Sequence, residues 1–238
     1  MQLKFQGDPG IGQVETLAER AASLLRRDIL SGRLAPASKL VISDLAEGYA
    51  IGATPLREGL SRLVSQGLVR AIGQKGFRVA EVSREDLSDI ILMRCVIESE
   101  ALRRSMRDGG DDWEAGIVAS LYRLKRFADR GTKVFSSDLD SFEAVHKSFH
   151  TALIAACGSP RMLEVHSALY DQIYRYRRRM LENVPNLDAF CVEHEQLAAL
   201  ALARDADEGC ERLCAHFERT ITSVYPNEPK SPAALRKQ

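Results

Sequence analysis

The sequence predicts a mostly α-helical protein in two parts: a winged helix-turn-helix with a small β-hairpin over residues 14–82, and an all-α antiparallel helical bundle over residues 83–225. Three observations support this prediction. Apolar residues recur at helical spacing along most of the chain, strand-like patterns occur only around residues 68–82, and charge of opposite sign collects in the two parts. The two ends, residues 1–13 and 226–238, are polar or proline-rich, and we expect them to be flexible tails.

The first predicted helix runs from about residue 16 to residue 31. Thr16 and Glu19 stand at the spacing of a capping box, in which the two side chains satisfy backbone N–H groups that lack a helical partner. Gly32 follows the last apolar residue of the pattern, where a helix commonly ends. We expect this helix to support the pair of helices that comes next.

Residues 42–63 predict two short helices separated by a tight turn. The second helix has a start signal, because Thr54 can cap it and Pro55 suits the first helical position, where no N–H is needed. Its apolar face consists of Leu56, Leu60, Leu63 and Val64.

The opposite face of this helix is polar and rich in hydroxyl and guanidinium groups. Such groups on the first turns of a helix can reach base edges and phosphates in a major groove. Taken alone, the helix is better explained as an ordinary solvated amphipathic helix. Two strand patterns follow it, joined by the basic turn Gly73–Gly76, and this order of elements is typical of a winged helix-turn-helix. We therefore predict DNA contacts from Ser43, Thr54, Arg57, Ser61, Arg62, Lys75 and Gly76.

Beyond residue 83 the apolar pattern is helical throughout. It predicts six helices, which run approximately over residues 84–107, 112–129, 138–157, 160–182, 187–203 and 206–225. The short connections between them favour antiparallel packing in a bundle.

Charge is distributed unevenly between the two parts. The chain of 238 residues has a formal net charge of zero, but residues 1–80 hold 11 Lys or Arg against 7 Asp or Glu, a net of +4. The remaining residues hold 22 against 26, a net of −4. A basic first part and an acidic second part fit a DNA-binding head attached to a separate ligand-binding body.

No apolar run approaches the length of a membrane span, and the N-terminal residues show no apolar segment typical of secretion. The five cysteines are odd in number and contain no Cys-x-x-Cys pair. We therefore expect a cytoplasmic protein with reduced thiols and no membrane partner.

Four of the five histidines lie on predicted inward faces of three helices. His146 and His150 are four residues apart, a spacing by which one helix presents two ligands to a metal. His194 and His216 lie beside apolar residues of the last two helices. Each histidine alone is more often a core residue with satisfied hydrogen bonds, but four together predict an imidazole-rich metal site.

Arg94 falls within the apolar stripe of the helix over residues 84–107. A buried guanidinium requires an anionic partner. One candidate is Glu98, one turn later, as an internal ion pair; the other is the carboxylate of a small effector bound beside the metal. Tyr170 and Tyr174 share one helix and are candidates to line an effector pocket, with packing in the core as the alternative.

Several short motifs stand in order along the N-terminal part. They are Gly32–Pro36, Asp44–Ala46, Thr54–Leu60 with Arg62–Leu63, and Gly67–Val69, of which the run Thr54–Leu60 is the most specific. Together they resemble the GntR family of bacterial transcription regulators, and the resemblance implies operator binding by this domain. Two positions depart from the family pattern. Gly52-Ala53 stands where Ser-Arg is usual, which removes an expected DNA contact, and Ala37 stands where many members have glycine.

The helical part resembles the FCD ligand-binding domain that many GntR regulators carry, and its six predicted helices favour the VanR-like branch. This resemblance implies a homodimer that binds a near-palindromic operator, a small organic acid as effector, and a divalent metal held by an Asp-x-x-x-His pair with two further histidines. His150, His194 and His216 match the family's histidines, whereas His146 replaces the aspartate. An all-imidazole set favours zinc or nickel over manganese or magnesium.

The chain is therefore predicted to be a metabolite-responsive repressor, not an enzyme, that a small carboxylate releases from its operator. Two alternatives belong to other classes. A metal-dependent hydrolase would use the histidines for catalysis, but the chain has no His-Asp dipeptide and no His-Glu-x-x-His motif. A non-specific architectural protein would bind DNA without sequence preference.

Overall fold

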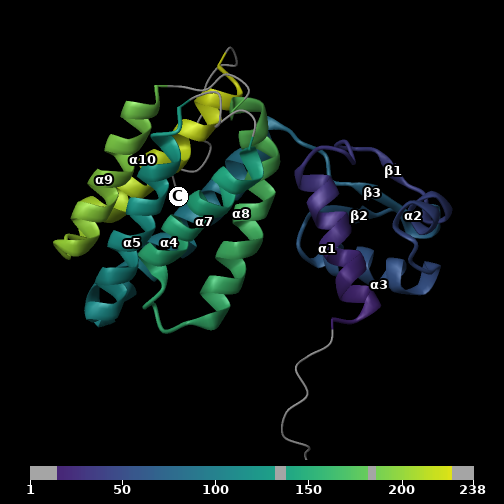
Figure 1. Ribbon diagram of the computed structural model, residues 1–238, viewed down its shortest axis with the longest axis horizontal. Helices are drawn as coiled ribbons and strands as arrows, with labels where there is room; N and C mark the ends of the chain where they lie inside the picture. The colour runs from purple at the N-terminus through teal and green to yellow at the C-terminus, as the bar shows by residue number, and fades with distance from the viewer. Residues whose placement is uncertain (1–14, 132–137, 182–185, 227–238) are drawn as a thin grey trace, which may run out of the picture. The chain divides into compact units, whose positions relative to one another are not determined.

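The computed structural model describes residues 15–131, 138–181 and 186–226. The chain divides into two compact units, Met1–Ala80 and Glu81–Gln238. The first unit combines helices with a small antiparallel sheet, whereas the regular elements described in the second are all helices (Figure 1). The predicted fold class, mostly helical with a helix-turn-helix unit and an all-α unit, is confirmed.

The described part of the first unit contains three α-helices and one small sheet. The helices are α1 (Leu17–Leu30), α2 (Ile42–Tyr49) and α3 (Ala53–Ser65), and the strands β1 (Lys39–Leu40), β2 (Val69–Ala71) and β3 (Phe77–Val79) pair in the order β1-β3-β2. Strand β1 was not predicted, because two residues are too few to show an alternating pattern. Both strands of the hairpin are shorter than the sequence pattern suggested.

Helix α1 begins as the sequence predicts. The Thr16 hydroxyl accepts a hydrogen bond from the Glu19 N–H at 3.2 Å, and the Glu19 carboxylate accepts one from the Thr16 N–H at 2.9 Å. Both halves of the capping box are present, so two backbone donors that lack helical partners are satisfied.

The start of α3 differs from the prediction. Gly52 occupies the N-cap position with an extended backbone and no side-chain hydrogen bond, and Ala53 is the first helical residue. The expected cap at Thr54 is therefore wrong, and Thr54 and Pro55 both lie in the first turn. Pro55 is tolerated there because the first four N–H groups of a helix have no helical acceptor.

Helices α1 and α3 approach closely beside Gly59. A Cβ atom at Gly59 would lie 2.9 Å from the backbone nitrogen of Ala22 and 3.1 Å from the Cβ of Ala21. The fully buried leucines of α3 are Leu56, Leu60 and Leu63. This packing fixes which side of α3 faces the core and which side faces solvent.

A tight connection joins β2 to β3. Residues Gly73–Lys75 form one 3-10 turn, and Gly76 has a φ of 90°, in the region that favours glycine. The Ile72 N–H donates to the Gly76 carbonyl at 2.8 Å, which closes the hairpin. Arg78 donates to the Ala37 carbonyl at 2.8 Å and so ties β3 to the loop before β1.

Six helices make up the described part of the second unit. They are α4 (Arg84–Asp108), α5 (Asp111–Ala128), α7 (Leu139–Ile154), α8 (Pro160–Leu181), α9 (Leu187–Leu202) and α10 (Ala206–Val224). Side-chain caps open five of them and come from Ser83, Asp138, Ser159, Asn186 and Asp205. All six helices contribute to one apolar core, and their bounds lie within a few residues of the predicted ones.

Tyr176 of α8 fixes the start of α4. Its hydroxyl accepts a hydrogen bond from the Ser83 N–H at 3.2 Å and donates one to the Asp86 carboxylate at 2.5 Å, and its ring is fully buried. Helix α4 is the first element after the boundary between the units, at Ala80. Tyr176 therefore fixes the position of Ser83 and Asp86, which follow closely after the boundary between the two units in the sequence.

Some predictions fall on residues that the structure does not describe. The predicted tails lie outside the described residues apart from Pro226, and so do residues 132–137. The helix count behind the VanR-like branch therefore stays a prediction. Within the described ranges, no helix has both the length and the apolar character needed to cross a membrane.

Candidate functional site

The exposed face of α3 carries most of the predicted DNA contacts. Thr54, Arg57, Ser61 and Arg62 are all exposed, opposite the buried leucines. The Ser61 hydroxyl donates to the Arg57 carbonyl at 2.9 Å, so it is engaged within its own helix. Arg62 forms an ion pair with Glu19 of α1 at 3.3 Å. The exposed side chains of α3 thus have different partners: Ser61 bonds within α3, whereas Arg62 forms an ion pair with α1.

The other predicted DNA contacts come from α2 and the wing. Ser43 on α2 is exposed, and its hydroxyl donates to the Asp44 carboxylate at 3.0 Å. Lys75 is exposed in the connection between β2 and β3, and Gly76 beside it is half-buried. All seven predicted residues therefore belong to one unit and are at least partly accessible.

The sheet adds a row of cations that the sequence reasoning missed. Lys39 of β1 lies directly opposite Arg78 of β3, which lies directly opposite Arg70 of β2. All three side chains are exposed, and residues opposite one another in neighbouring strands share a face. The row was not visible in the sequence because it depends on β1, which shows no strand pattern of its own.

Four histidines from three helices meet in the second unit. They are His146 and His150 of α7, His194 of α9 and His216 of α10, and each offers a ring nitrogen within 4.8 Å of the others. The Nε2 atom of His146 lies 3.0 Å from the Nε2 atoms of both His150 and His194. The structure therefore brings together the four residues that the sequence singled out as metal ligands; we call them the histidine cluster.

Backbone and carboxylate oxygens orient two of these rings. The Phe190 carbonyl lies 2.7 Å from His194 Nδ1, and the Glu193 carboxylate lies 3.1 Å from His216 Nδ1. Because these oxygens can only accept, Nδ1 carries the proton in both rings and Nε2 presents its lone pair.

His146 is oriented by a buried chain of polar groups. The Tyr170 hydroxyl lies 2.8 Å from His146 Nδ1 and donates to Glu143 at 3.2 Å, and Arg177 Nε donates to the same carboxylate at 3.0 Å. The hydroxyl proton goes to the ionised carboxylate, so His146 Nδ1–H donates to the hydroxyl oxygen and its Nε2 keeps a lone pair. Sequence reasoning missed Glu143 and Arg177, although Glu143 lies one turn before His146 on the same inward stripe of α7.

Burial keeps the rings of the cluster neutral. It is the largest cause that lowers the pKa values of His146, His150 and His194 well below their usual range, and neighbouring positive groups add to it. Burial also lowers the pKa of His216, although the hydrogen bond to Glu193 opposes the shift. Neutral imidazole is the form that binds a metal.

The donor set fits a divalent metal. A tetrahedral ion with nitrogen ligands at about 2.0–2.1 Å keeps those nitrogens roughly 3.3 Å apart, close to the 3.0 Å separations found here. His150 Nδ1 is buried and, among the described residues, has no hydrogen-bond partner, so this ring lacks the outer acceptor that His194 and His216 have. The histidine cluster could therefore hold a metal ion.

Arg94 is buried beside this cluster and is paired internally. Its Nε and Nη2 atoms donate to the two carboxylate oxygens of Glu98 at 2.5 and 3.0 Å, and its guanidinium lies 3.8 Å from the centre of the Phe217 ring. Glu98 also lies 3.1 Å from His166 Nδ1. Burial raises the pKa of Glu98, but Arg94 and His166 outweigh burial and hold the pKa at about 2. In this structure the partner of Arg94 is therefore Glu98.

The two tyrosines proposed for an effector pocket have different surroundings. Tyr170 is buried against His146 and Glu143, as described above. Tyr174 is also buried, and its hydroxyl donates to the Asp140 carboxylate in the first turn of α7 at 2.5 Å. Tyr170 thus belongs to the shell of the histidine cluster, whereas Tyr174 connects α8 to the start of α7.

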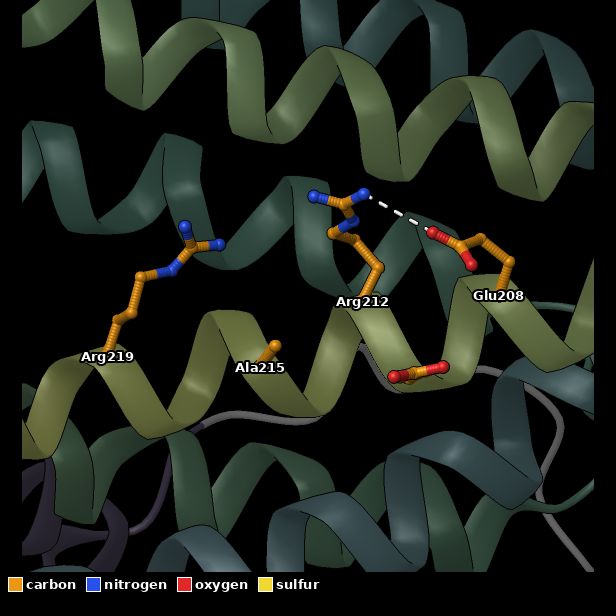
Figure 2. Close-up of a pocket in the computed structure, with 5 residues that line it drawn as sticks. Glu208, Arg212, Ala215 and Arg219 are labelled. Atoms are coloured by element: carbon orange, nitrogen blue, oxygen red, sulfur yellow. Dashed lines mark hydrogen bonds and ion pairs between the residues drawn. The ribbon is translucent and has the colours of Figure 1, made fainter.

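Figure 2 shows a separate hollow along α10, with a volume of about 290 Å³. Its lining residues are Glu208, Glu211, Arg212, Ala215 and Arg219. Arg212 pairs with Glu208 at 3.3 Å, and Arg219 pairs with Glu193 of α9 at 2.7 Å. Because no histidine of the cluster lines it, this hollow is the ion-paired outer face of α10 and not part of the histidine site.

The geometry defines a class of protein: a winged helix-turn-helix unit joined to a helical unit that holds the histidine cluster, which is the arrangement of a transcription regulator. Two family models match the chain. The model described as bacterial regulatory proteins, gntR family, matches residues 17–79, and the FCD domain model matches residues 89–219. The chain belongs to the GntR family of transcription regulators and carries an FCD domain.

Similar proteins agree with this assignment. The chain is 39% identical over 216 residues to the uncharacterized HTH-type transcriptional regulator BphR of Paraburkholderia xenovorans (strain LB400), covering 90% of this chain and 87% of that protein. It is 37% identical over 206 residues to the HTH-type transcriptional repressor GlaR of Escherichia coli (strain K12), covering 84% and 92%. Among solved structures, E. coli McbR/YncC has a similar fold, with a TM-score of 0.71 at 22% identity over 89% of this chain and 98% of that one. The domains and relatives are those of transcription regulators and not of enzymes, so the hydrolase alternative is not supported.

Proposed function

We propose that this protein is a repressor that binds a near-palindromic operator as a homodimer, and that a small carboxylate bound beside a metal in the helical unit releases it. One observation carries the proposal. The same chain presents an exposed polar face on α3 and, in its other unit, four imidazoles, three of them buried, whose ring nitrogens lie within 4.8 Å of one another. The similarity to GlaR, which is named a repressor, supports the direction of regulation.

Arg57 is the residue on which we expect sequence recognition to depend most. Its side chain is exposed in the second turn of α3, and a guanidinium can pair bidentately with a guanine edge. Arg57→Ala should lower the affinity for the operator by about 10- to 100-fold, because one such pair is worth roughly 1–3 kcal/mol. Fluorescence anisotropy with the chain's own promoter fragment, and with random DNA of equal length, measures this effect.

The cation row of the sheet provides the matched comparison. Lys39, Arg78 and Arg70 are placed to neutralise phosphates, which carry no sequence information. Arg70→Ala should weaken binding to promoter and random DNA alike, and should reduce the slope of log affinity against log salt by about one. If Arg57→Ala instead lowers the affinity for promoter and random DNA by the same factor, Arg57 does not take part in base recognition.

For the histidine cluster we propose zinc or nickel. His146 supplies an imidazole where a carboxylate would favour harder ions, and all four donors are neutral nitrogens. Phe190 and Glu193 hold two of the rings so that Nε2 faces inward. A bound divalent ion would supply a fixed positive charge that attracts a carboxylate ligand into the bundle.

Metal content tests this assignment directly. Protein purified without chelators should contain about one zinc or nickel per chain by elemental mass spectrometry, and His150→Ala or His194→Ala should lose it. His166→Gln is the matched control, because His166 is buried in the same unit but pairs with Glu98 outside the cluster. Metal-free wild-type protein would contradict the proposal.

For the effector we propose a carboxylate that shares Arg94 with Glu98. Arg94 stacks on Phe217, the residue after His216, so its guanidinium lies next to the histidine cluster. The guanidinium carbon also lies 5.4 Å from the centre of the Tyr170 ring. An Arg94→Ala variant that folds and binds DNA but ignores its effector would support this role. Loss of folding would instead assign Arg94 to the internal ion pair alone.

The homodimer is proposed to form through the outer face of α4. Leu92, Met93 and Val96 lie within one turn of each other on α4, and these residues are 53, 43 and 59% exposed. Val96→Glu should produce a monomer in size-exclusion chromatography with light scattering. Val118→Glu is the matched control, because Val118 is 54% exposed on α5. Equal effects of the two substitutions would show that the α4 face is not the interface.

A further inference from the structure

One carboxylate of the first unit is buried, although the proposed function does not use it. Asp28 lies in the last turn of α1 and is 2% exposed. Its Oδ2 atom accepts a hydrogen bond from the Tyr49 hydroxyl at 2.7 Å. The exposed guanidiniums of Arg27 and Arg33 lie 3.4 and 3.3 Å from the same carboxylate. Burying a carboxylate costs free energy unless such partners replace water, so these contacts fix where Asp28 can lie.

The Tyr49 hydroxyl joins two helices through this bond. Tyr49 is half-buried and is the last residue of α2. Burial and the hydrogen bond to Asp28 raise the pKa of Tyr49, so the hydroxyl keeps its proton and donates it to the carboxylate. The bond therefore connects the last turn of α1 to the end of α2, 21 residues further along the chain.

The turn between α2 and α3 begins directly after Tyr49. Ala50 has a φ of 52°, in the left-handed region that residues with a Cβ atom rarely adopt. Ile51 is 5% exposed, and Gly52 is the N-cap of α3. Such a backbone persists only where its surroundings hold it in place. Here the turn is held on both sides, by Tyr49 before Ala50 and by the buried Ile51 after it.

Helix α1 thus holds α3 at two places. It contacts α3 directly where Ala22 faces Gly59. Asp28 lies six residues further along α1, about 9 Å along its axis, and holds the residue that leads into the turn before α3. One contact fixes the position of a helix, whereas two contacts separated along the supporting helix also fix its direction.

We infer that Asp28 is a positioning residue for DNA recognition, which acts through Tyr49 to set the direction in which α3 presents Arg57. This inference rests on the operator binding proposed above. A bidentate pair between a guanidinium and a base edge needs close alignment of both groups, whereas contacts to phosphates carry no sequence information. A small tilt of α3 therefore affects the preference for the operator more than the affinity for DNA in general.

Tyr49→Phe in the full-length protein tests the inference, because it removes the hydroxyl and keeps the ring. Fluorescence anisotropy measures the affinity for the chain's own promoter fragment and for random DNA of equal length. We expect the ratio of the two affinities to fall by roughly 3- to 10-fold, a part of the roughly 10- to 100-fold loss expected for Arg57→Ala. The affinity for random DNA and the helical signal in circular dichroism should stay unchanged. Tyr122→Phe is the matched control and should leave the ratio unchanged, because Tyr122 is 64% exposed in the other unit.

A double variant shows whether Tyr49 acts through Arg57. If it does, Tyr49→Phe should lower the ratio no further in an Arg57→Ala background. Asp28→Ala removes the same hydrogen bond from the side of α1 and should lower the ratio at least as much as Tyr49→Phe.

The outcomes separate this inference from the proposed function. An unchanged ratio in Tyr49→Phe, an equal loss of affinity for both DNAs, or an additive loss in the double variant would each overturn the inference and leave operator binding intact. Loss of the helical signal in Tyr49→Phe would assign the bond to stability alone. Wild-type protein that binds promoter and random DNA equally would instead overturn operator recognition, and this inference with it.

Discussion

The two units of this protein treat polar side chains in opposite ways. In the described part of the first unit, Asp28 is the only charged side chain that is buried, and the candidate DNA contacts stand in solvent. The second unit encloses arginines, glutamates and imidazoles in its core, and it pairs Arg94 with Glu98 and Arg177 with Glu143. One unit presents its functional groups on top of an apolar core, whereas the other builds them into the core.

This difference has an energetic consequence. Exposed groups contribute little to the free energy of folding. They are therefore available for recognition and can be replaced without unfolding the unit. A buried charge is tolerated only with its partner, so the functional groups of the second unit are also structural ones. We therefore expect single substitutions to separate binding from folding in the first unit and to affect both in the second.

The largest effect is expected for Glu98→Ala. This change leaves Arg94 and His166 buried without their shared carboxylate, and breaking such a pair should lower the free energy of unfolding by about 3–5 kcal/mol. Urea denaturation measures it. Glu100→Ala is the matched control on the same helix, because the Glu100–Arg104 pair is exposed and contributes little to stability. An equal loss of unfolding free energy in the two variants would show that the buried ion pair is no more important for stability than the exposed one.

Acid should reveal the same carboxylate. The folded protein holds the pKa of Glu98 at about 2, below its ordinary value of 4.5. A lowered pKa contributes stability that is fully present above about pH 4.5 and is lost as the pH falls towards 2. The free energy of unfolding, measured at a series of pH values, should therefore fall more steeply with decreasing pH in this window for the wild type than for Glu98→Gln.

In the first unit the sensitive element is apolar packing. Gly59→Ala places a methyl group 2.9 Å from the Ala22 nitrogen, and overpacking of this kind should destabilise the unit by about 1–3 kcal/mol. Gly48→Ala on α2 is the matched control, because no atom lies within 4 Å of its added Cβ; it should stabilise by about 0.5–1 kcal/mol. Thermal unfolding that shows Gly59→Ala as neutral would mean that α1 and α3 can separate freely.

Tyr176→Phe tests the hydrogen bonds at the start of α4. The variant loses the bonds to Ser83 and Asp86, and we expect a loss of about 1 kcal/mol in unfolding free energy. Tyr122→Phe should have no effect, because Tyr122 is 64% exposed. Hydrogen exchange of the first turn of α4 should rise only in Tyr176→Phe, and protection that stays unchanged would contradict the assigned role.

The smallest effect is expected for Gly52→Ser. Gly52 caps α3 without a side chain, and a serine hydroxyl at this position can accept a hydrogen bond from the first turn. The gain should be a few tenths of a kcal/mol, measurable as a small rise in melting temperature. A loss would indicate that the exposed start of α3 has a steric role.

The sequence predicted what depends on local pattern. The capping box at Thr16, the helices of the bundle and the inward stripe of His146 and His150 follow from spacing along one helix, and the structure shows them. It did not predict Gly52 as the cap, because the signals from Thr54 and Pro55 specify a helix start only to within a turn.

Contacts between distant segments lay beyond this reasoning. Arg177 reaches Glu143 from another helix, and the row of Lys39, Arg78 and Arg70 needs a register that only the folded sheet defines. Residue type and spacing find candidates within one helix, but partners across the fold require the tertiary structure.

Helix α8 contacts both the histidine cluster and the start of α4. It spans 22 residues, about 33 Å as a straight helix. Tyr170 contacts His146. Tyr176 lies roughly 9 Å further along the helix axis and forms hydrogen bonds with Ser83 and Asp86. One helix therefore contacts both the imidazoles and the first turn of α4, and no other element intervenes between these two contacts.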